Sequence, residues 1–176
     1  IDDVITCVAR KQTPVILTRF KEHAKFLHDA LKEKADHVFL LYGDNSDKEN
    51  AEIRVKLKQI PENESLILVA TGQKIGEGFD FPRLDVLMLA APVSFEGRLE
   101  QYVGRLNRDY VGKEAVYVYD YIDSHVRYFD KMYAKRLRTY RKTGFSIWTQ
   151  ELQPKQIINA IFDSVNYTEK FEQDIV

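Results

Sequence analysis

Ser65-Leu-Ile-Leu-Val-Ala70 places five apolar residues in succession, and the glycine-bearing segment Thr71-Gly-Gln-Lys-Ile-Gly-Glu-Gly-Phe-Asp80 follows at once. A short apolar run bounded by turn signals is typical of a strand that is buried on both faces. In open α/β sheets, ligands bind just beyond the carboxyl ends of such strands. The stretch therefore predicts a central parallel strand over residues 65–70 and a candidate ligand loop over residues 71–80.

Similar apolar runs alternate with helix-like segments along the chain. This alternation predicts an α/β fold with a mainly parallel sheet, covered on both faces and joined by right-handed connections. Residues 1–13 are expected to form a short strand or a strap, residues 145–148 a short strand or packed turn, and residues 166–176 a fraying acidic end. The other predicted strands are 14–18, 37–42, 85–90 and 114–120, and the predicted helices are 20–34, 50–59, 95–109, 124–142 and 154–165.

The composition is that of a globular domain of ordinary size. The 176 residues are 44% hydrophobic and 30% charged, which argues against wholesale disorder. The net charge of -1 gives no global nucleic-acid signal, so any such site must be local. The single Cys7 excludes an internal disulfide and fits a reducing, cytoplasmic location, and no apolar run approaches the length of a membrane span.

Gln101-Tyr-Val-Gly-Arg-Leu-Asn-Arg108 is the second distinctive stretch. On a helix, Gln101, Arg105 and Arg108 fall within about 60° of one another. Two guanidinium groups on a rigid element suit a polyanion, because each can bind phosphate oxygens bidentately. Taken alone, the pattern fits an ordinary amphipathic surface helix equally well. The apolar side to be buried consists of Leu99, Tyr102, Val103 and Leu106.

The loop 71–80 contains groups that suit a nucleotide. Gly76 and Gly78 let backbone N–H groups approach a ligand closely, and Asp80 can accept from a ribose hydroxyl or orient an arginine. The two glycines alone are weak evidence, and the dinucleotide-binding fingerprint is missing. Because neighbouring parallel strands deliver their loops to one edge of the sheet, we expect this loop and the 101–108 helix to converge on one anion.

In order and spacing, these segments resemble the superfamily 2 helicases. Ala70-Thr-Gly with Gly76-Glu-Gly-Phe-Asp80 is similar to motif V, Gln101-x-x-Gly104-Arg105-x-x-Arg108 to motif VI, and Pro14-Val-Ile-Leu-Thr-Arg-Phe20 to motif IV. The resemblance covers residues 1–123. Gln101 stands at the start of motif VI, where other members have His, and in this the chain resembles the bacterial DEAD/DEAH-type and restriction-subunit-like helicases. It implies a RecA-like, P-loop NTPase-type three-layer sandwich that forms the C-terminal lobe of a two-lobe, ATP-driven helicase or translocase.

The resemblance also implies roles for individual residues. Arg105 and Arg108 would be arginine fingers facing the γ-phosphate of ATP, and Gln101 would contact the same phosphate. A finger arginine supplies on the order of 10³–10⁵ in rate. The nucleotide-binding residues of motif V would be Gly76, Gly78 and Asp80. The track, for DNA or RNA with DNA favoured, would be lined by Thr18, Arg19, Thr71 and Gly72.

Half of an ATP site is missing from this sequence. It has no Gly-x-x-x-x-Gly-Lys-Ser/Thr motif and no Asp-Glu pair after an apolar strand. The chain begins at Ile1 rather than Met, so we expect a piece of a longer protein. The N-terminal RecA-like lobe of that protein would hold Mg²⁺ and activate water, and the isolated chain is expected to lack ATPase activity.

Residues 124–176 lie beyond the motifs and are expected to form a helical extension packed on the lobe. In residues 124–142 a single acid, Asp130, accompanies many cations, with aromatic residues interleaved. One interpretation is a contact with nucleic-acid phosphates or with the first lobe, and the other is a solvated amphipathic helix whose aromatic residues pack on the sheet. The cations expected on the exterior are Arg127, Lys131, Lys135, Arg136, Arg138, Arg141 and Lys142.

Two alternatives to a motor lobe remain. The chain fits a RecA-like binding or docking module that uses its arginines without turnover. A dinucleotide-dependent enzyme is a weaker alternative, because its glycine fingerprint and ribose-binding acid are missing. An upstream phosphate-binding loop and Asp-Glu pair in the full-length protein would select the motor.

Overall fold

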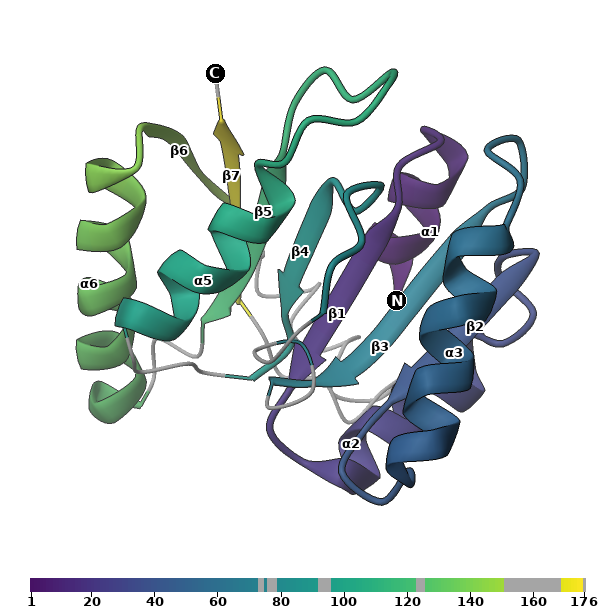
Figure 1. Ribbon diagram of the computed structural model, residues 1–176. Helices are drawn as coiled ribbons and strands as arrows, with labels where there is room; N and C mark the ends of the chain where they lie inside the picture. The colour runs from purple at the N-terminus through teal and green to yellow at the C-terminus, as the bar shows by residue number, and fades with distance from the viewer. Residues whose placement is uncertain (73–74, 76–78, 92–95, 123–125, 151–168, 176) are drawn as a thin grey trace.

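One sheet runs through the protein, with helices on both of its faces (Figure 1). The computed structural model describes residues 1–72, 75, 79–91, 96–122, 126–150 and 169–175. Within these residues the sheet has seven strands in the order β2-β3-β1-β4-β5-β7-β6. The parallel strands are β1 (Pro14–Thr18), β2 (His37–Leu41), β3 (Leu66–Thr71), β4 (Val86–Leu89) and β5 (Tyr117–Ile122), and the antiparallel strands are β6 (Phe145–Gln150) and β7 (Glu169–Ile175).

Strand β1 lies between β3 and β4 in the middle of the parallel part. Leu17 pairs with Ala70 of β3 on one side and with Leu89 of β4 on the other. Every residue of these three strands is buried, as their continuous apolar runs predict. The last residues of β1 and β3, Thr18 and Thr71, pair directly, so the segments after these strands leave the sheet side by side.

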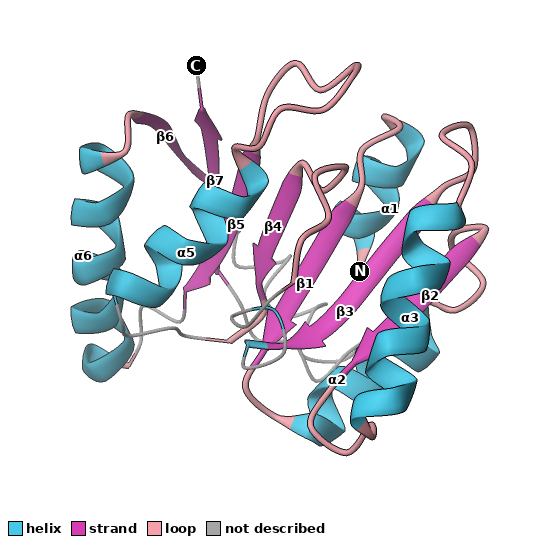
Figure 2. Ribbon diagram, viewed as in Figure 1, coloured by secondary structure: helices cyan, strands magenta, loops and turns pink. Residues whose placement is uncertain are grey.

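Helices cover both faces of the sheet, as expected for a three-layer α/β fold (Figure 2). On one face, α1 (Asp2–Ala9) and α2 (Lys21–Leu31) bury Cys7 and Leu27 against the strands. On the other, α3 (Asp47–Gln59), α5 (Glu96–Leu106) and α6 (Arg127–Lys142) contribute Leu57, Tyr102 and Tyr140 to a second cluster. None of the described helices is long and apolar enough to cross a membrane.

Helix α3 begins at Asp47, three residues before the predicted start at Asn50. The Ser46 hydroxyl accepts from the backbone N–H of Glu49 at 3.2 Å, and the Glu49 carboxylate accepts from the backbone N–H of Ser46 at 2.7 Å. This reciprocal pair is a capping box, which satisfies two N–H groups at the helix start. It fixes the start of α3 although the first turn of the helix is almost entirely polar.

The structure corrects the predictions for the two ends of the chain. Residues 2–9 are helix α1 rather than a strand or strap, and Val4, Cys7 and Val8 pack on the sheet at the spacing of one helix face. The predicted fraying end is wrong for residues 169–175, which form β7 between β5 and β6. The extension is therefore not purely helical. The predicted helix 154–165 lies outside the described residues.

A buried ion pair joins α6 to β5. The Arg136 guanidinium donates from Nε to Asp120 Oδ2 at 2.6 Å and from Nη2 to Oδ1 at 2.8 Å, and the Tyr140 hydroxyl donates to Oδ2 at 3.0 Å. The side chains of Arg136 and Asp120 are only 3% and 1% exposed. The prediction that Arg136 lies on the exterior of the helix is therefore wrong, because its charge is neutralised inside the fold.

Burial raises the pKa of Asp120, and the charge of Arg136 and the two hydrogen-bonding partners oppose that rise. The Tyr133 ring also lies beneath the guanidinium, 5.8 Å from Cζ to the ring centroid. A buried charge that keeps all of its partners is tolerated, whereas one that loses a partner is costly.

Asp120→Asn should therefore destabilise the chain strongly, because it leaves the Arg136 charge buried beside a neutral amide. We expect a loss of about 3–5 kcal/mol in the free energy of unfolding, measured by urea unfolding with circular dichroism. The double variant D120N/R136M should recover part of that loss. Asp130→Asn, on the exposed face of α6, is the control and should stay within about 0.5 kcal/mol of the parent. Equal losses in D120N and D130N would contradict the assignment.

Candidate nucleotide and nucleic-acid site

Three side chains in and just after α5 reach the segment that follows β3. The Tyr102 hydroxyl donates to the Gly72 carbonyl at 2.7 Å, and the Arg105 guanidinium donates to the Phe79 carbonyl. Arg108 pairs with Asp80, with 2.5 Å between Nη1 and Oδ1. The structure thus brings together Arg105, Arg108 and Asp80, as the sequence predicts.

Arg108 is positioned differently from the prediction. Helix α5 ends at Leu106, so Arg108 lies in the turn beyond the helix rather than on its face. The Lys113 ammonium holds this turn by donating to the carbonyls of Leu106 at 2.6 Å and Arg108 at 3.1 Å. Burial lowers the pKa of Lys113, with Asp85 and Asp109 acting in the opposite direction. Lys113 is a positioning residue that the sequence motif does not include.

The polar side chains of this site remain accessible to a ligand. Gln101 is exposed, and the side chains of Arg108 and Asp80 are 51% and 53% exposed. A half-exposed ion pair contributes about 0–1 kcal/mol, so Arg108 is held in place without being locked. A phosphate group offers a guanidinium more than one charged oxygen and can therefore compete with a single carboxylate.

The opposite side of α5 is buried as predicted, and it determines how close the helix comes to β3. Leu99, Tyr102, Val103 and Leu106 are each at most 2% exposed. A Cβ atom at position 72 would lie 2.7 Å from the Tyr102 hydroxyl oxygen, which is too close for any side chain. Glycine at 72 therefore permits the contact between α5 and the end of β3.

The residues predicted to line a nucleic-acid track do gather at one edge. Thr18 and Thr71 pair directly, and Arg19 follows as an exposed residue. Thr18 is only 2% exposed, and its hydroxyl shares a 3.0 Å hydrogen bond with His23 Nδ1. Burial lowers the pKa of that histidine. Thr18 is thus a supporting residue at this edge, and Arg19 is the accessible one.

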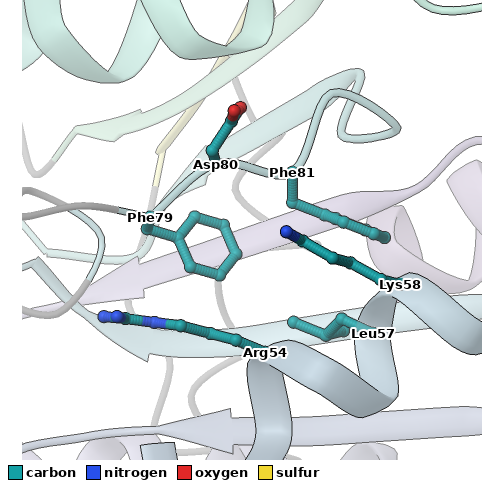
Figure 3. Close-up of a pocket in the computed structure, with 6 residues that line it drawn as sticks. All are labelled: Arg54, Leu57, Lys58, Phe79, Asp80 and Phe81. Carbon is teal, nitrogen blue, oxygen red and sulfur yellow. The ribbon is translucent and has the colours of Figure 1, made fainter. Parts of the chain in front are cut away.

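A small pocket lies beside Asp80 and was not predicted from the sequence. Figure 3 shows Arg54 and Lys58 reaching from α3 toward the segment Phe79–Phe81. The two cations are four residues apart, so they occupy one face of α3. That spacing was visible in the sequence, but nothing in it indicated that α3 packs beside the loop. Gly76 and Gly78 lie outside the described residues.

The arrangement supplies cations for phosphate oxygens and a carboxylate for a hydroxyl. Among the described residues there is no group of three His, Cys, Asp or Glu side chains that could hold a metal ion.

Sequence comparison finds viral relatives, whereas no protein-family model matches the chain. The transcript termination protein A18 of Yaba-like disease virus is 32% identical over 99 residues, which are 56% of this chain and 20% of that protein. The 161L protein of Invertebrate iridescent virus 6, which carries a helicase name, is 33% identical over 118 residues, 66% of this chain and 22% of that protein. The chain thus spans about a fifth of the length of these curated relatives.

Three solved structures share the fold. T4 UvsW matches 80% of this chain and 31% of its own chain, with a TM-score of 0.62 and 20% identity. The C-terminal domain of S. cerevisiae Dbp5 matches 81% of this chain and 77% of its own, with a TM-score of 0.54 and 16% identity. The ATP-dependent restriction-modification enzyme LlaBIII bound to DNA matches 80% of this chain and 12% of its own, with a TM-score of 0.55 and 18% identity. The chain therefore shares the fold of these proteins, and part of its sequence is similar to a helicase-named viral protein.

Proposed function

We propose that this chain is the C-terminal motor lobe of an ATP-dependent helicase or translocase. The observation that carries the proposal is the position of Arg105 and Arg108 against the Phe79–Asp80 segment, at one edge of the sheet and accessible to a ligand. The fold that the chain shares with T4 UvsW and the helicase name of the 161L relative support the proposal. A docking module without turnover would need no such pairing of arginines with the loop.

In this proposal the lobe completes an ATP site that is shared with an N-terminal RecA-like lobe. Mg²⁺, held by that first lobe, would neutralise phosphate charge. Arg108 exchanges its contact with Asp80 for the γ-phosphate, and Arg105 and Gln101 orient the same group. Asp80, once released, would accept a hydrogen bond from a ribose hydroxyl, and Gly76 and Gly78 are assigned to nucleotide binding from the sequence alone. Bidentate guanidinium groups suit the equatorial oxygens of a transferring phosphoryl group.

The carboxyl edge of β1 and β3 is the proposed nucleic-acid track. Arg19 supplies an exposed cation, and Gly72 and the paired threonines Thr18 and Thr71 shape the edge. The LlaBIII neighbour is bound to DNA, which favours DNA over RNA for this chain. We also propose that residues 1–123 are the lobe and residues 124–176 an extension packed on it, in a cytoplasmic protein with its one cysteine, Cys7, reduced.

Tyr102 connects the two halves of the proposed site. It lies on α5, which carries Arg105 and leads into the turn that carries Arg108, and its hydroxyl donates to the Gly72 carbonyl at the start of the track segment. A shift of α5 on nucleotide binding would therefore move the backbone at Gly72. This contact directly connects α5 to the segment that follows β3.

The arginine-finger role predicts a large loss of turnover in the full-length protein. Arg108→Ala and Arg108→Lys should each lower the kcat of ATP hydrolysis about 10³-fold or more. Alanine removes the charge, and the lysine ammonium cannot bind two phosphate oxygens at once as the planar guanidinium does. Nucleic-acid affinity measured without nucleotide should stay within about threefold. Arg10→Ala, which removes an exposed arginine of α1's C-terminal end, is the control. Normal turnover by R108A would favour a docking module.

The isolated 176-residue chain should show no ATPase activity with Mg²⁺, because it lacks a phosphate-binding loop and the paired acids of a metal site. The measurement is phosphate release at high protein concentration, with and without DNA. Metal-dependent turnover that disappears in the R108A variant would overturn this prediction.

The contact between Tyr102 and Gly72 predicts a non-additive pair of substitutions. Gly72→Ala should lower the free energy of unfolding by about 1–3 kcal/mol, because its Cβ would meet the Tyr102 hydroxyl. Tyr102→Phe alone should cost about 0.5–1.5 kcal/mol. The double variant should cost less than the sum, since the hydroxyl is then absent, and urea unfolding measures all three. Strict additivity would show that the two residues do not touch.

The same pair also predicts a loss of coupling in the full-length protein. Tyr102→Phe should reduce the stimulation of ATP hydrolysis by DNA several-fold, while the rate without DNA changes little. An unaltered ratio of the two rates would rule out a coupling role for Tyr102.

A further inference from the structure

Helix α6 carries a narrow row of cations on its outer surface. At 100° per residue, five of them fall within about 80° of one another. All five are exposed, and consecutive members are three or four residues apart. We call this row the basic strip. It consists of Arg127, Lys131, Lys135, Arg138 and Lys142.

The opposite face of α6 fixes the direction in which the basic strip points. Met132, Thr139 and Tyr140 are at most 4% exposed and pack inward. Arg136, on the same inner face, is held by Asp120 of β5 through two hydrogen bonds. Rotation of the helix would break this buried pair, so the strip stays on the outer surface.

The basic strip has little internal compensation. Lys142 lies 3.0 Å from Glu100 of α5, and both groups are exposed. In the part of the chain that the structure describes, no acidic side chain pairs with any of the other four cations. Like charges three or four residues apart on a helix repel one another and lower its stability. The strip therefore costs stability in the free protein, and an anionic partner would remove that cost.

The position and shape of the strip suit a nucleic-acid backbone. Helix α6 begins five residues after the end of β5, at the sheet edge where β1 and β3 also end, and runs back along the sheet (Figure 1). Its cations extend over about 22 Å at a spacing of about 5–6 Å. Tyr128, which is 64% exposed, lies at the end nearest that edge and offers a ring on which a base can stack.

We propose that the basic strip of α6 binds the phosphate backbone of the nucleic acid where it leaves the edge formed by β1 and β3. This proposal rests on the proposed helicase function and extends its track to a surface outside motifs IV, V and VI. A regular row of cations beside an exposed aromatic ring fits a polyphosphate with bases. An acidic patch on the first lobe would need no such ring.

The test compares two triple variants of the full-length protein. K131Q/K135Q/R138Q removes three cations of the strip, and K32Q/K34Q/K56Q removes three exposed lysines elsewhere on the chain. The probe is a fluorescein-labelled 30-nucleotide single-stranded DNA, titrated at several salt concentrations. The slope of log K against log salt should fall by about 0.7 for each lost phosphate contact, so by about 2 in the strip variant. The control variant should keep the parental slope.

Tyr128→Ala provides an independent readout. It should weaken binding about tenfold at every salt concentration without changing the slope, because stacking releases no counterions. A strip variant whose slope falls no more than that of the control would overturn the proposal, and so would reduced ATP hydrolysis with unchanged DNA affinity, which would indicate a contact with the first lobe. If the parent protein binds neither this DNA nor the same RNA sequence, the proposed function itself fails.

Discussion

The parallel pairing of β1 with β3 and β4 is the constraint on which the rest of the site depends. These three strands are buried on both faces, so their side chains cannot slip by one residue without changing the entire core. Their common direction sends the segments after β1 and β3 to the same edge, and Thr18 lies against Thr71 there. The candidate ligand groups are thus brought together by burial of apolar strands rather than by attraction among themselves.

Helix α5 builds on that constraint with contacts of different strength. Its apolar side is fully buried and gives the helix a fixed position on the sheet. The turn just after the helix holds the loop through a half-exposed ion pair between Arg108 and Asp80. Strong packing on one side and weak pairing beyond the end of the helix allow Arg108 to change partners without loss of the contact between α5 and the sheet.

The sequence predicted much of this architecture, because continuous apolar runs and glycine-bearing turns identify buried strands and their ends. The predicted bounds of β1 are those observed.

Polar strands and long-range contacts were not predictable in the same way. Strand β7, Glu-Lys-Phe-Glu-Gln-Asp-Ile, has no apolar run and joins the sheet through backbone pairing with strands distant in sequence. In the sequence Arg136 looks like its exposed basic neighbours. Only the fold shows that it pairs with Asp120, sixteen residues earlier in the chain. Arg108 left the expected helix because α5 ends one turn early, where Lys113 binds its carbonyls.

Strand β7 also has a consequence for where the lobe can be divided. It pairs with the whole length of β5 and continues to β6, so β5 is an interior strand although it is the last strand of the helicase motifs. A chain cut after Ile122 would leave the N–H and C=O groups along one side of β5 without partners. Such an open edge is a template for pairing between molecules. Residues 169–175 thus cover this side of β5, and removing them would leave it as an open edge of the sheet.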